Sequence, residues 1–242
     1  MVSVFLVLFV FHSFPGEILF FIDIIKIMRK KISFLILTIL AVGSLYFLIF
    51  PDGENVFAGV GSVIDVIKID SSTTNGPTTS ADDNYGSSVS NIGDLNNDGI
   101  DDVAVGAPDD DAGGSSRGAV HIHFMNTDGS IDSTVEINDL TANGPDFSGT
   151  WPYFGSSIDG SVDLNSDGVN DIIVGAPLDD ESGFNFGAFY ILFMNTDGSI
   201  DSTVKINDLT TNGPALDASY SYGASVSFVG DINDDGVVDI AV

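Results

Sequence analysis

Cysteine is absent from the 242-residue chain, and basic residues are scarce. Without cysteine, the chain can form no disulfide bond, thiolate metal site or cysteine nucleophile. Seven lysine and arginine residues stand against 35 acidic residues, which gives a formal net charge of −28. Residues 1–58 hold four acids and four bases, so residues 59–242 carry the other 31 acids and only three bases. No nucleic-acid partner is expected, because nucleic-acid binding needs lysine and arginine at the phosphates.

A catalytic constellation is also missing from the sequence. The chain has only three histidines, no defensible Ser-His-Asp arrangement and no phosphate-binding loop. His121 and His123 lie on one face of a predicted strand and could pair on a metal. Their counterparts in the repeat described below are Tyr190 and Leu192, which favours a packed or exposed strand pair. We therefore expect a protein without enzyme activity.

One acidic motif of nine residues occurs three times, at residues 94–102, 163–171 and 231–239. Each copy has Asp, Asn and Asp at positions 1, 3 and 5, Gly at position 6 and Asp at position 9. Hard cations such as Ca²⁺ take about six to eight oxygen ligands from flexible loops. Alternate residues of a tight loop can turn their oxygens to one centre, and glycine at position 6 permits the sharp turn.

We predict about one Ca²⁺ in each of these three loops. An acidic turn without an ion is disfavoured, because converging carboxylates repel one another. The backbone carbonyls of position 7 would complete each shell, and they belong to Ile100, Val169 and Val237. The predicted side-chain ligands are Asp94, Asn96, Asp98 and Asp102; Asp163, Asn165, Asp167 and Asp171; and Asp231, Asn233, Asp235 and Asp239.

The N-terminal region predicts export. Residues 32–50 form a nearly continuous apolar run after the basic sequence Arg29-Lys30-Lys31, and Val56-Phe57-Ala58 offers small residues for cleavage. The run is also long enough to cross a bilayer as a helix, so residues 28–58 are either a signal peptide or a membrane anchor. Either alternative places the remaining chain outside the cell, since the basic cluster precedes the run.

Residues 1–27 are apolar but are interrupted by Pro15-Gly16-Glu17 and Asp23. Met28 begins the sequence Met-Arg-Lys-Lys, which is typical of a natural start. We expect the natural protein to begin at Met28, so that residues 1–27 are a mis-translated extension upstream of the true start. The alternative is a first hydrophobic membrane segment.

A repeat of about 68 residues extends from Gly61 to the C-terminus. Residues 124–134 return as residues 193–203, and Asn75-Gly-Pro returns as Asn143-Gly-Pro and Asn212-Gly-Pro. Strand patterns occur in the first unit at residues 85–92, 102–108, 119–125 and 134–137, with a hairpin turn at residues 126–130. Four short antiparallel strands per repeated unit are typical of a β-propeller blade.

Two segments of this repeat resemble FG-GAP repeats. Tyr85-Gly86 with Gly106-Ala107-Pro108, and Phe154-Gly155 with Gly175-Ala176-Pro177, each enclose an acidic loop. FG-GAP repeats form the propeller of integrin α subunits and occur in many bacterial and archaeal surface proteins. The resemblance covers residues 61–242 and implies calcium in strand-to-strand loops on one face of a propeller. Dockerins and EF-hands use a similar loop, but a helix follows theirs, whereas β runs follow these.

The sequence therefore predicts an all-β fold, namely a partial β-propeller of about two and a half four-stranded FG-GAP blades behind an N-terminal hydrophobic helix. Closed propellers have about 4–8 blades, so we expect the missing blades from a longer chain or from another chain. The predicted parts are the last strand of a preceding blade plus a linker (59–84), blade 1 (85–152), blade 2 (153–221) and a truncated blade 3 (222–242).

The leading functional hypothesis is an exported calcium-binding module for cell-surface adhesion or protein recognition, with calcium in a structural role. Its partner would be a protein ligand or a cell-surface partner. Trp151 and Tyr153 precede the second blade and are either an exposed aromatic contact or core residues. Two alternatives remain open: the non-catalytic propeller portion of a larger secreted hydrolase or lyase, and an architectural surface-layer component.

Overall fold

The computed structural model describes residues 66–147, 151–181, 186–216 and 221–242. The predictions for residues 1–58, which include the hydrophobic helix, the signal or anchor and the start at Met28, lie outside these residues. Every regular element of the described ranges is a strand, which confirms the all-β prediction. Within these ranges, no helix has the length and apolar character needed to span a membrane.

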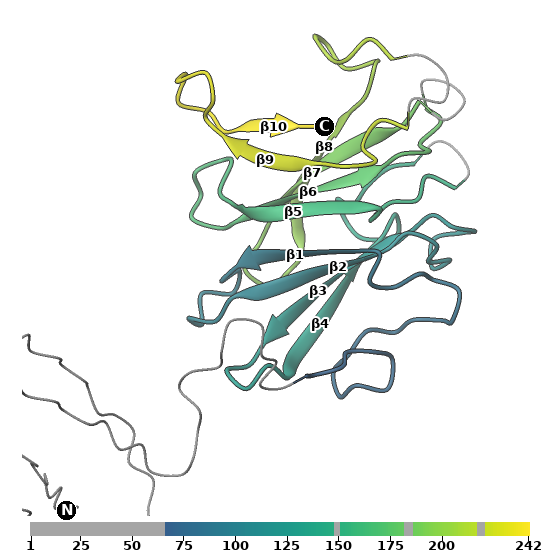
Figure 1. Ribbon diagram of the computed structural model, residues 1–242, viewed down its shortest axis with the longest axis vertical. Coiled ribbons are helices and arrows are strands. Elements are labelled where there is room, and N and C mark those ends of the chain that lie inside the picture. The colour runs from purple at the N-terminus through teal and green to yellow at the C-terminus, as the bar shows by residue number, and fades with distance from the viewer. Residues whose placement is uncertain (1–65, 148–150, 182–185, 217–220) are drawn as a thin grey trace, which may run out of the picture. The chain divides into compact units, whose positions relative to one another are not determined.

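The strands form two four-stranded antiparallel sheets and one two-stranded sheet (Figure 1). The first sheet consists of β1 (Ser88–Gly93), β2 (Asp102–Ala107), β3 (Ala119–Met125) and β4 (Ile131–Ile137). The second sheet consists of β5 (Ser157–Val162), β6 (Asp171–Ala176), β7 (Ala188–Met194) and β8 (Ile200–Ile206). The third sheet consists of β9 (Ser227–Gly230) and β10 (Asp239–Ala241). Such sheets are consistent with blades of a partial propeller.

The strands follow the predicted segments closely. β2 ends before Pro108, which cannot donate to a strand ladder. β3 and β4 are joined by the predicted hairpin turn, in which Asn126 N donates to the carbonyl of Ser130 at 2.8 Å. β4 begins at Ile131, three residues earlier than the sequence pattern indicated.

The last strand of a preceding blade, predicted within residues 59–84, stays a prediction. Residues 66–84 contain turns and irregular backbone and no strand, whereas residues 59–65 lie outside the described residues. A strand needs a neighbour for its backbone hydrogen bonds.

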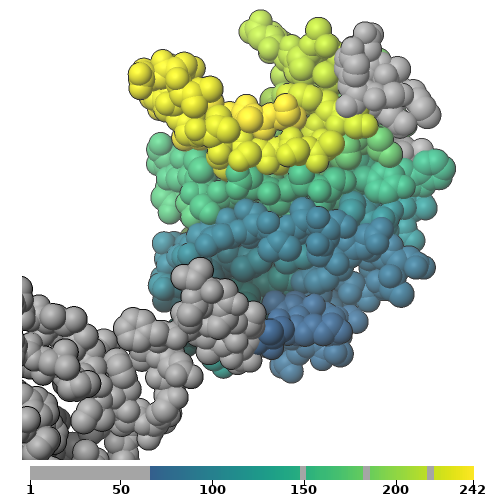
Figure 2. Space-filling model, in the orientation of Figure 1, coloured from purple at the N-terminus to yellow at the C-terminus, as the bar shows by residue number. Residues whose placement is uncertain are grey.

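The sheets pack face to face, and apolar side chains fill the space between them. The largest core lies between the first and second sheets and includes Ile122 and Phe124 of β3 and Ile172, Val174 and Leu192 of the second sheet. A smaller core joins the second sheet to the third. Figure 2 shows the first unit (blue), the second (green) and the third (yellow) as successive layers in contact on the visible face.

Backbone atoms of neighbouring sheets approach each other where the aromatic-Gly and Gly-Ala-Pro motifs meet. A Cβ atom on Gly106 would lie only 2.0 Å from the carbonyl oxygen of Gly155. The Ser88 hydroxyl donates to the same oxygen at 2.6 Å. Ser157 and the carbonyl of Gly223 repeat this bond at 2.8 Å between the second and third units. Gly106 and Gly155 are thus required by close packing of consecutive units.

The Asn-Gly-Pro motif also connects consecutive units, through what we call the asparagine clasp. Asn143 Nδ2 donates to the carbonyls of Ile200 at 3.1 Å and Asp201 at 3.0 Å, at the start of β8. The Thr203 hydroxyl donates back to the carbonyl of Asn143 at 2.6 Å. Asn75 makes the equivalent contacts with β4. The loop before each sheet therefore holds the outer strand of that sheet.

His121 and His123 are packed inside the molecule, which is one of the two alternatives that the repeat comparison left open. Both side chains are fully buried, and their rings stack with centroids 6.3 Å apart. His123 Nε2 lies 2.6 Å from the hydroxyl of Tyr85, and His123 Nδ1 lies 2.8 Å from the hydroxyl of Thr134. Burial lowers the pKa of both histidines from 6.5 to about 4.

We predict that Asn143→Ala destabilises the chain more than Asn212→Ala. Both asparagines have positive φ (56° and 60°) and precede Gly-Pro, so both substitutions carry the same backbone strain. Only Asn143 also loses two hydrogen bonds to a neighbouring strand, which should cost about 1–2 kcal/mol more in the free energy of unfolding. Chemical denaturation measures this difference, and equal losses would contradict the clasp.

We also predict that the contribution of His121 and His123 to the free energy of unfolding decreases as the pH falls from about 6.5 to about 4 and then levels off. The unfolded chain binds protons on His121 and His123 at higher pH than the folded chain, so protonation favours unfolding. Each histidine contributes at most about 1.4 kcal/mol per pH unit in this window. The matched control is His121→Tyr with His123→Leu, as in the second unit. Denaturation curves of this variant should lack that part of the pH dependence.

Candidate cation-binding loops

The three acidic loops occupy equivalent places in the three units. Each connects the first strand of a sheet to the second, between β1 and β2, between β5 and β6, and between β9 and β10. Figure 1 shows these three connections projecting from the same side of the stacked sheets, at the left of the view. The repeat therefore brings all three motifs to one end of the strands.

Side-chain oxygens and backbone N–H groups close the first loop into a tight turn. Asp94 accepts hydrogen bonds from the N–H groups of Asp98 at 2.9 Å and Gly99 at 2.8 Å. Asn96 Oδ1 also accepts from Asp98 N, and Asp98 Oδ1 accepts from Ile100 N, both at 2.9 Å. These contacts bring the oxygens of positions 1, 3 and 5 around the same short backbone segment.

The second and third loops repeat all four of these hydrogen bonds. The donor–acceptor distances are 2.8–3.1 Å in the second loop and 2.8–3.0 Å in the third. Position 4 has positive φ in every loop, and the glycine at position 6 has φ of 91°, 91° and 87°. The sequence spacing thus produces one backbone conformation three times.

The aspartate at position 9 has a role that the sequence did not indicate. Asp102 is fully buried, and its two oxygens accept hydrogen bonds from Leu95 N and Met125 N, both at 3.0 Å. Asp171 makes the same contacts with Leu164 N at 2.8 Å and Met194 N at 3.1 Å. Burial raises the pKa of both carboxyl groups. These carboxylates join the loop, the second strand and the end of the third strand.

The third loop lacks part of this support. Asp239 Oδ2 accepts from Ile232 N at 2.9 Å, but Oδ1 lies 3.4 Å from Asn233 Nδ2 instead of a backbone donor on a third strand. Residues 231–237 are all exposed. The third loop therefore has the same turn as the others and weaker attachment to its sheet.

Position 8 is a second feature that the sequence analysis did not identify. Asn170 Nδ2 donates to the carbonyl of Ile92 at 3.0 Å, so the second loop contacts the inner strand of the first sheet. Asp101 occupies this position in the first loop and accepts from Asn91 within its own unit at 3.0 Å. The one signal in the sequence is that position 8 differs between the loops, being Asp101 in the first and Asn170 in the second.

The residues of the loops fit a hard cation. Each loop gathers carboxylate, carboxamide and carbonyl oxygens without any nitrogen or sulfur ligand, which is the donor set that Ca²⁺ prefers. The carboxylates now accept backbone N–H groups, and each oxygen keeps a second lone pair. In the residues that the structure describes, no three His, Asp or Glu side chains are already gathered closely enough to hold a metal. Cation binding would therefore draw the loop oxygens inward.

Comparison with known proteins links these units to one repeat family. The FG-GAP repeat model matches residues 85–123 and 154–192. Integrin alpha-3 of Cricetulus griseus is 42% identical over 90 residues, which cover 37% of this chain and 8% of that subunit. Human integrin alpha-11 is 42% identical over 92 residues, which cover 38% of this chain and 7% of that subunit. Human integrin alpha-6 is 37% identical over 98 residues, covering 40% and 7% respectively.

The matched part of the chain thus spans less than a tenth of the length of these curated relatives. Both family matches begin at the aromatic-Gly motif, include the acidic loop and the Gly-Ala-Pro motif, and end within the third strand of a sheet. The chain therefore contains two FG-GAP repeats, and in these repeats it is related to the integrin alpha subunits.

Proposed function

We propose that this chain is an exported, calcium-binding FG-GAP propeller module that serves in cell-surface adhesion or protein recognition. The observation that carries this proposal is the threefold repetition of one oxygen-lined turn at the same end of consecutive sheets. Its localisation would be extracellular or at the cell surface, and its role would be binding rather than catalysis. The relatives that support it are named integrin alpha subunits.

Calcium would be held by the residues predicted from the motif. The ligands would be the side-chain oxygens of positions 1, 3, 5 and 9 and the carbonyl oxygen of position 7. A divalent cation would offset the repulsion among these carboxylates, which otherwise disfavours the compact turn. The excess of 31 acids over three bases in residues 59–242 supports a need for bound cations.

The calcium would be structural. Position 9 is attached through Asp102 or Asp171 to the end of the third strand, so an ion at the loop would stabilise the sheet as well as the turn. A ligand that binds only the folded state increases the free energy of unfolding. The missing blades would come from a longer chain or from a partner chain.

We predict that calcium raises the midpoint of thermal unfolding relative to a chelator. Each site should contribute about 2.7 kcal/mol when free calcium is about a hundred times its Kd. Asp98→Asn should reduce this calcium-dependent shift, because the substitution removes a loop carboxylate. The matched control is Asp128→Asn, which changes an Asp-Gly turn between β3 and β4. If the wild type unfolds at the same midpoint temperature in calcium and in chelator, the proposed structural role of calcium is wrong.

We further predict that Asp235→Asn reduces the calcium-dependent stabilisation less than Asp98→Asn. The two residues occupy the same position in the third and first loops, but Asp239 lacks the backbone donor that Met125 supplies to Asp102. The third loop should therefore bind calcium more weakly. Isothermal titration calorimetry should resolve a weaker class of site that disappears in Asp235→Asn. Three sites of equal affinity would contradict this ranking.

A further inference from the structure

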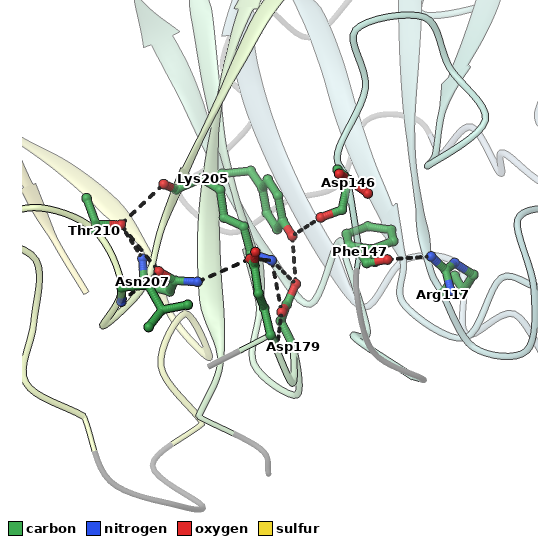
Figure 3. Close-up of polar contacts among 10 residues, drawn as sticks. Arg117, Asp146, Phe147, Asp179, Lys205, Asn207 and Thr210 are labelled. Atoms are coloured by element: carbon green, nitrogen blue, oxygen red, sulfur yellow. Dashed lines mark hydrogen bonds and ion pairs between the residues drawn. The ribbon is translucent and has the colours of Figure 1, made fainter. Parts of the chain in front are cut away.

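The second unit contains a lysine whose ammonium group lies against two carboxylates. Lys205 Nζ of β8 lies 3.0 Å from each oxygen of the Asp179 carboxylate and also pairs with Glu181 (Figure 3). The Lys205 side chain is 16% exposed, and that of Asp179 is 1% exposed. Because Nζ is equally far from both oxygens, it lies next to the carboxyl carbon between them. A nucleophilic atom and a carbonyl carbon therefore meet inside the folded chain.

The Asp179 carboxylate also accepts hydrogen bonds from two neutral donors. Oδ1 accepts from the backbone N–H of Glu181 at 3.0 Å, and Oδ2 accepts from the Tyr190 hydroxyl at 2.6 Å. The backbone of Asp179 is fixed as well, through hydrogen bonds of 3.1 Å with the carbonyl of Ala176 and the N–H of Gly187. Fixed donors of this kind stabilise negative charge that develops on a carbonyl oxygen during attack. They therefore prepare this carboxyl group for a nucleophile.

Lys205 and Glu181 are positioned by their own neighbours. Lys205 pairs with Tyr190 across β7 and β8, and its Nζ lies 5.6 Å from the centre of the Tyr190 ring. Glu181 Oε2 accepts from Asn207 Nδ2 at 3.4 Å, which keeps this second carboxylate beside the ammonium. Groups held together in this way react as if each were present at about 10⁵–10⁸ M. An amine, a carboxyl carbon and an acid–base group thus share one site.

The first unit has the same backbone frame without these groups. Asp110 corresponds to Asp179, and its backbone makes the same two hydrogen bonds. Glu136 of β4, however, stands at the register position of Lys205. A four-stranded sheet of this kind therefore forms without a lysine at this position, and the lysine is a feature of the second unit.

We propose that Lys205 and Asp179 become joined by an intramolecular amide bond, and that Glu181 is the catalytic acid–base group. The Lys205 nitrogen, once it has lost a proton to Glu181, attacks Cγ of Asp179 and forms the new C–N bond. Glu181 carries two protons, one after the other, from this nitrogen to one Asp179 oxygen. The bond from Cγ to that oxygen breaks and the oxygen leaves as water. One ammonium and one carboxylate thereby become one amide and one water, and Glu181 is regenerated.

Burial favours the amide over the ion pair. A buried ion pair retains the cost of removing two charges from water, and amide formation removes both charges. The released water leaves past Glu181, whose side chain is 41% exposed. The bond links β8 to the loop after β6, between residues that are 26 positions apart. It restricts the unfolded chain as a disulfide does, in a chain that has no cysteine.

The test is mass spectrometry of the whole folded chain after denaturation. The amide lowers the intact mass by one water molecule. Succinimide formation at an Asp-Gly sequence has the same effect on the mass, so the decisive measurement is a chymotryptic digest, which cleaves after the aromatic residues between Asp179 and Lys205. We expect one branched peptide that contains both residues. Recovery of Lys205 and Asp179 only in separate peptides from the folded wild type would overturn the proposal.

Two variants test the chemistry of the site. Lys205→Arg retains a positive charge but lacks the amine, so it should keep the full mass. Persistence of the water loss in Lys205→Arg would show that the water comes from elsewhere and would contradict the bond. Glu181→Gln should slow formation of the branched peptide about a hundredfold after refolding. Glu136→Gln makes the matched change in the first unit and should not alter the rate. Equal rates in Glu181→Gln and the wild type would exclude Glu181 as the acid–base group.

The pair of Lys68 and Asp70 provides a control within the same chain. Their side chains lie 2.7 Å apart, but that of Lys68 is 82% exposed. Contact alone should not produce an amide there, and the same digest should contain these two residues without a crosslink. A crosslink at both pairs would show that the reaction does not depend on the buried site and would contradict the role given to it.

The amide bond does not depend on the proposed calcium-binding or recognition role. Asp179 follows the end of β6, whereas the acidic loop of the second unit precedes the start of β6. The reaction uses only side chains of this chain and no metal ion. The branched peptide should therefore form equally in calcium and in chelator. Failure of the crosslink and failure of calcium-dependent stabilisation are thus separate results.

Discussion

Each four-stranded sheet depends on one buried carboxylate at the start of its second strand. Asp102 has no solvent contact, and it is tolerable there only because backbone N–H groups of Leu95 and Met125 satisfy its oxygens. Those two donors belong to the acidic loop and to the end of the third strand. The loop, β2 and β3 must therefore assemble together. A cation at the loop would act on a structure that is already continuous with the sheet.

The sequence was sufficient to predict the strands and the loops, because both follow from short-range patterns. Alternation of side chains, the Asp-Gly turn and Pro108 place the strands to within a few residues. The spacing of acidic residues likewise indicates which oxygens share a turn. Spacing does not reveal which N–H groups those oxygens meet. The contacts of Asp102 with Met125, and of Asn143 with β8, join residues that are 23 and more than 50 positions apart.

Local sequence patterns also do not reveal which strand or side chain a given segment pairs with in the folded chain. Residues 59–84 were predicted to contain the last strand of a preceding blade, and the described part of that range, residues 66–84, contains no strand. A ladder requires a neighbouring strand, which a local pattern does not supply. His121 is a second example. Comparison of the repeats favoured a packed or exposed strand pair with His123 and did not decide between the two. The structure shows both side chains buried and neither ring nitrogen of His121 hydrogen-bonded.

The two complete units separate what the fold requires from what it leaves open. Contacts between backbones, such as those of Gly106 and Gly155, and contacts of side chains with backbone, such as the asparagine clasp, are the same in both units. The ends of the strands carry different charges on this shared frame. Lys205 of β8 pairs with Asp179 and Glu181 in the second unit, whereas Glu136 of β4 stands at the equivalent register position of the first. The shared frame therefore accepts either charge at this position, and in the first unit burial raises the pKa of the Asp110 carboxyl group.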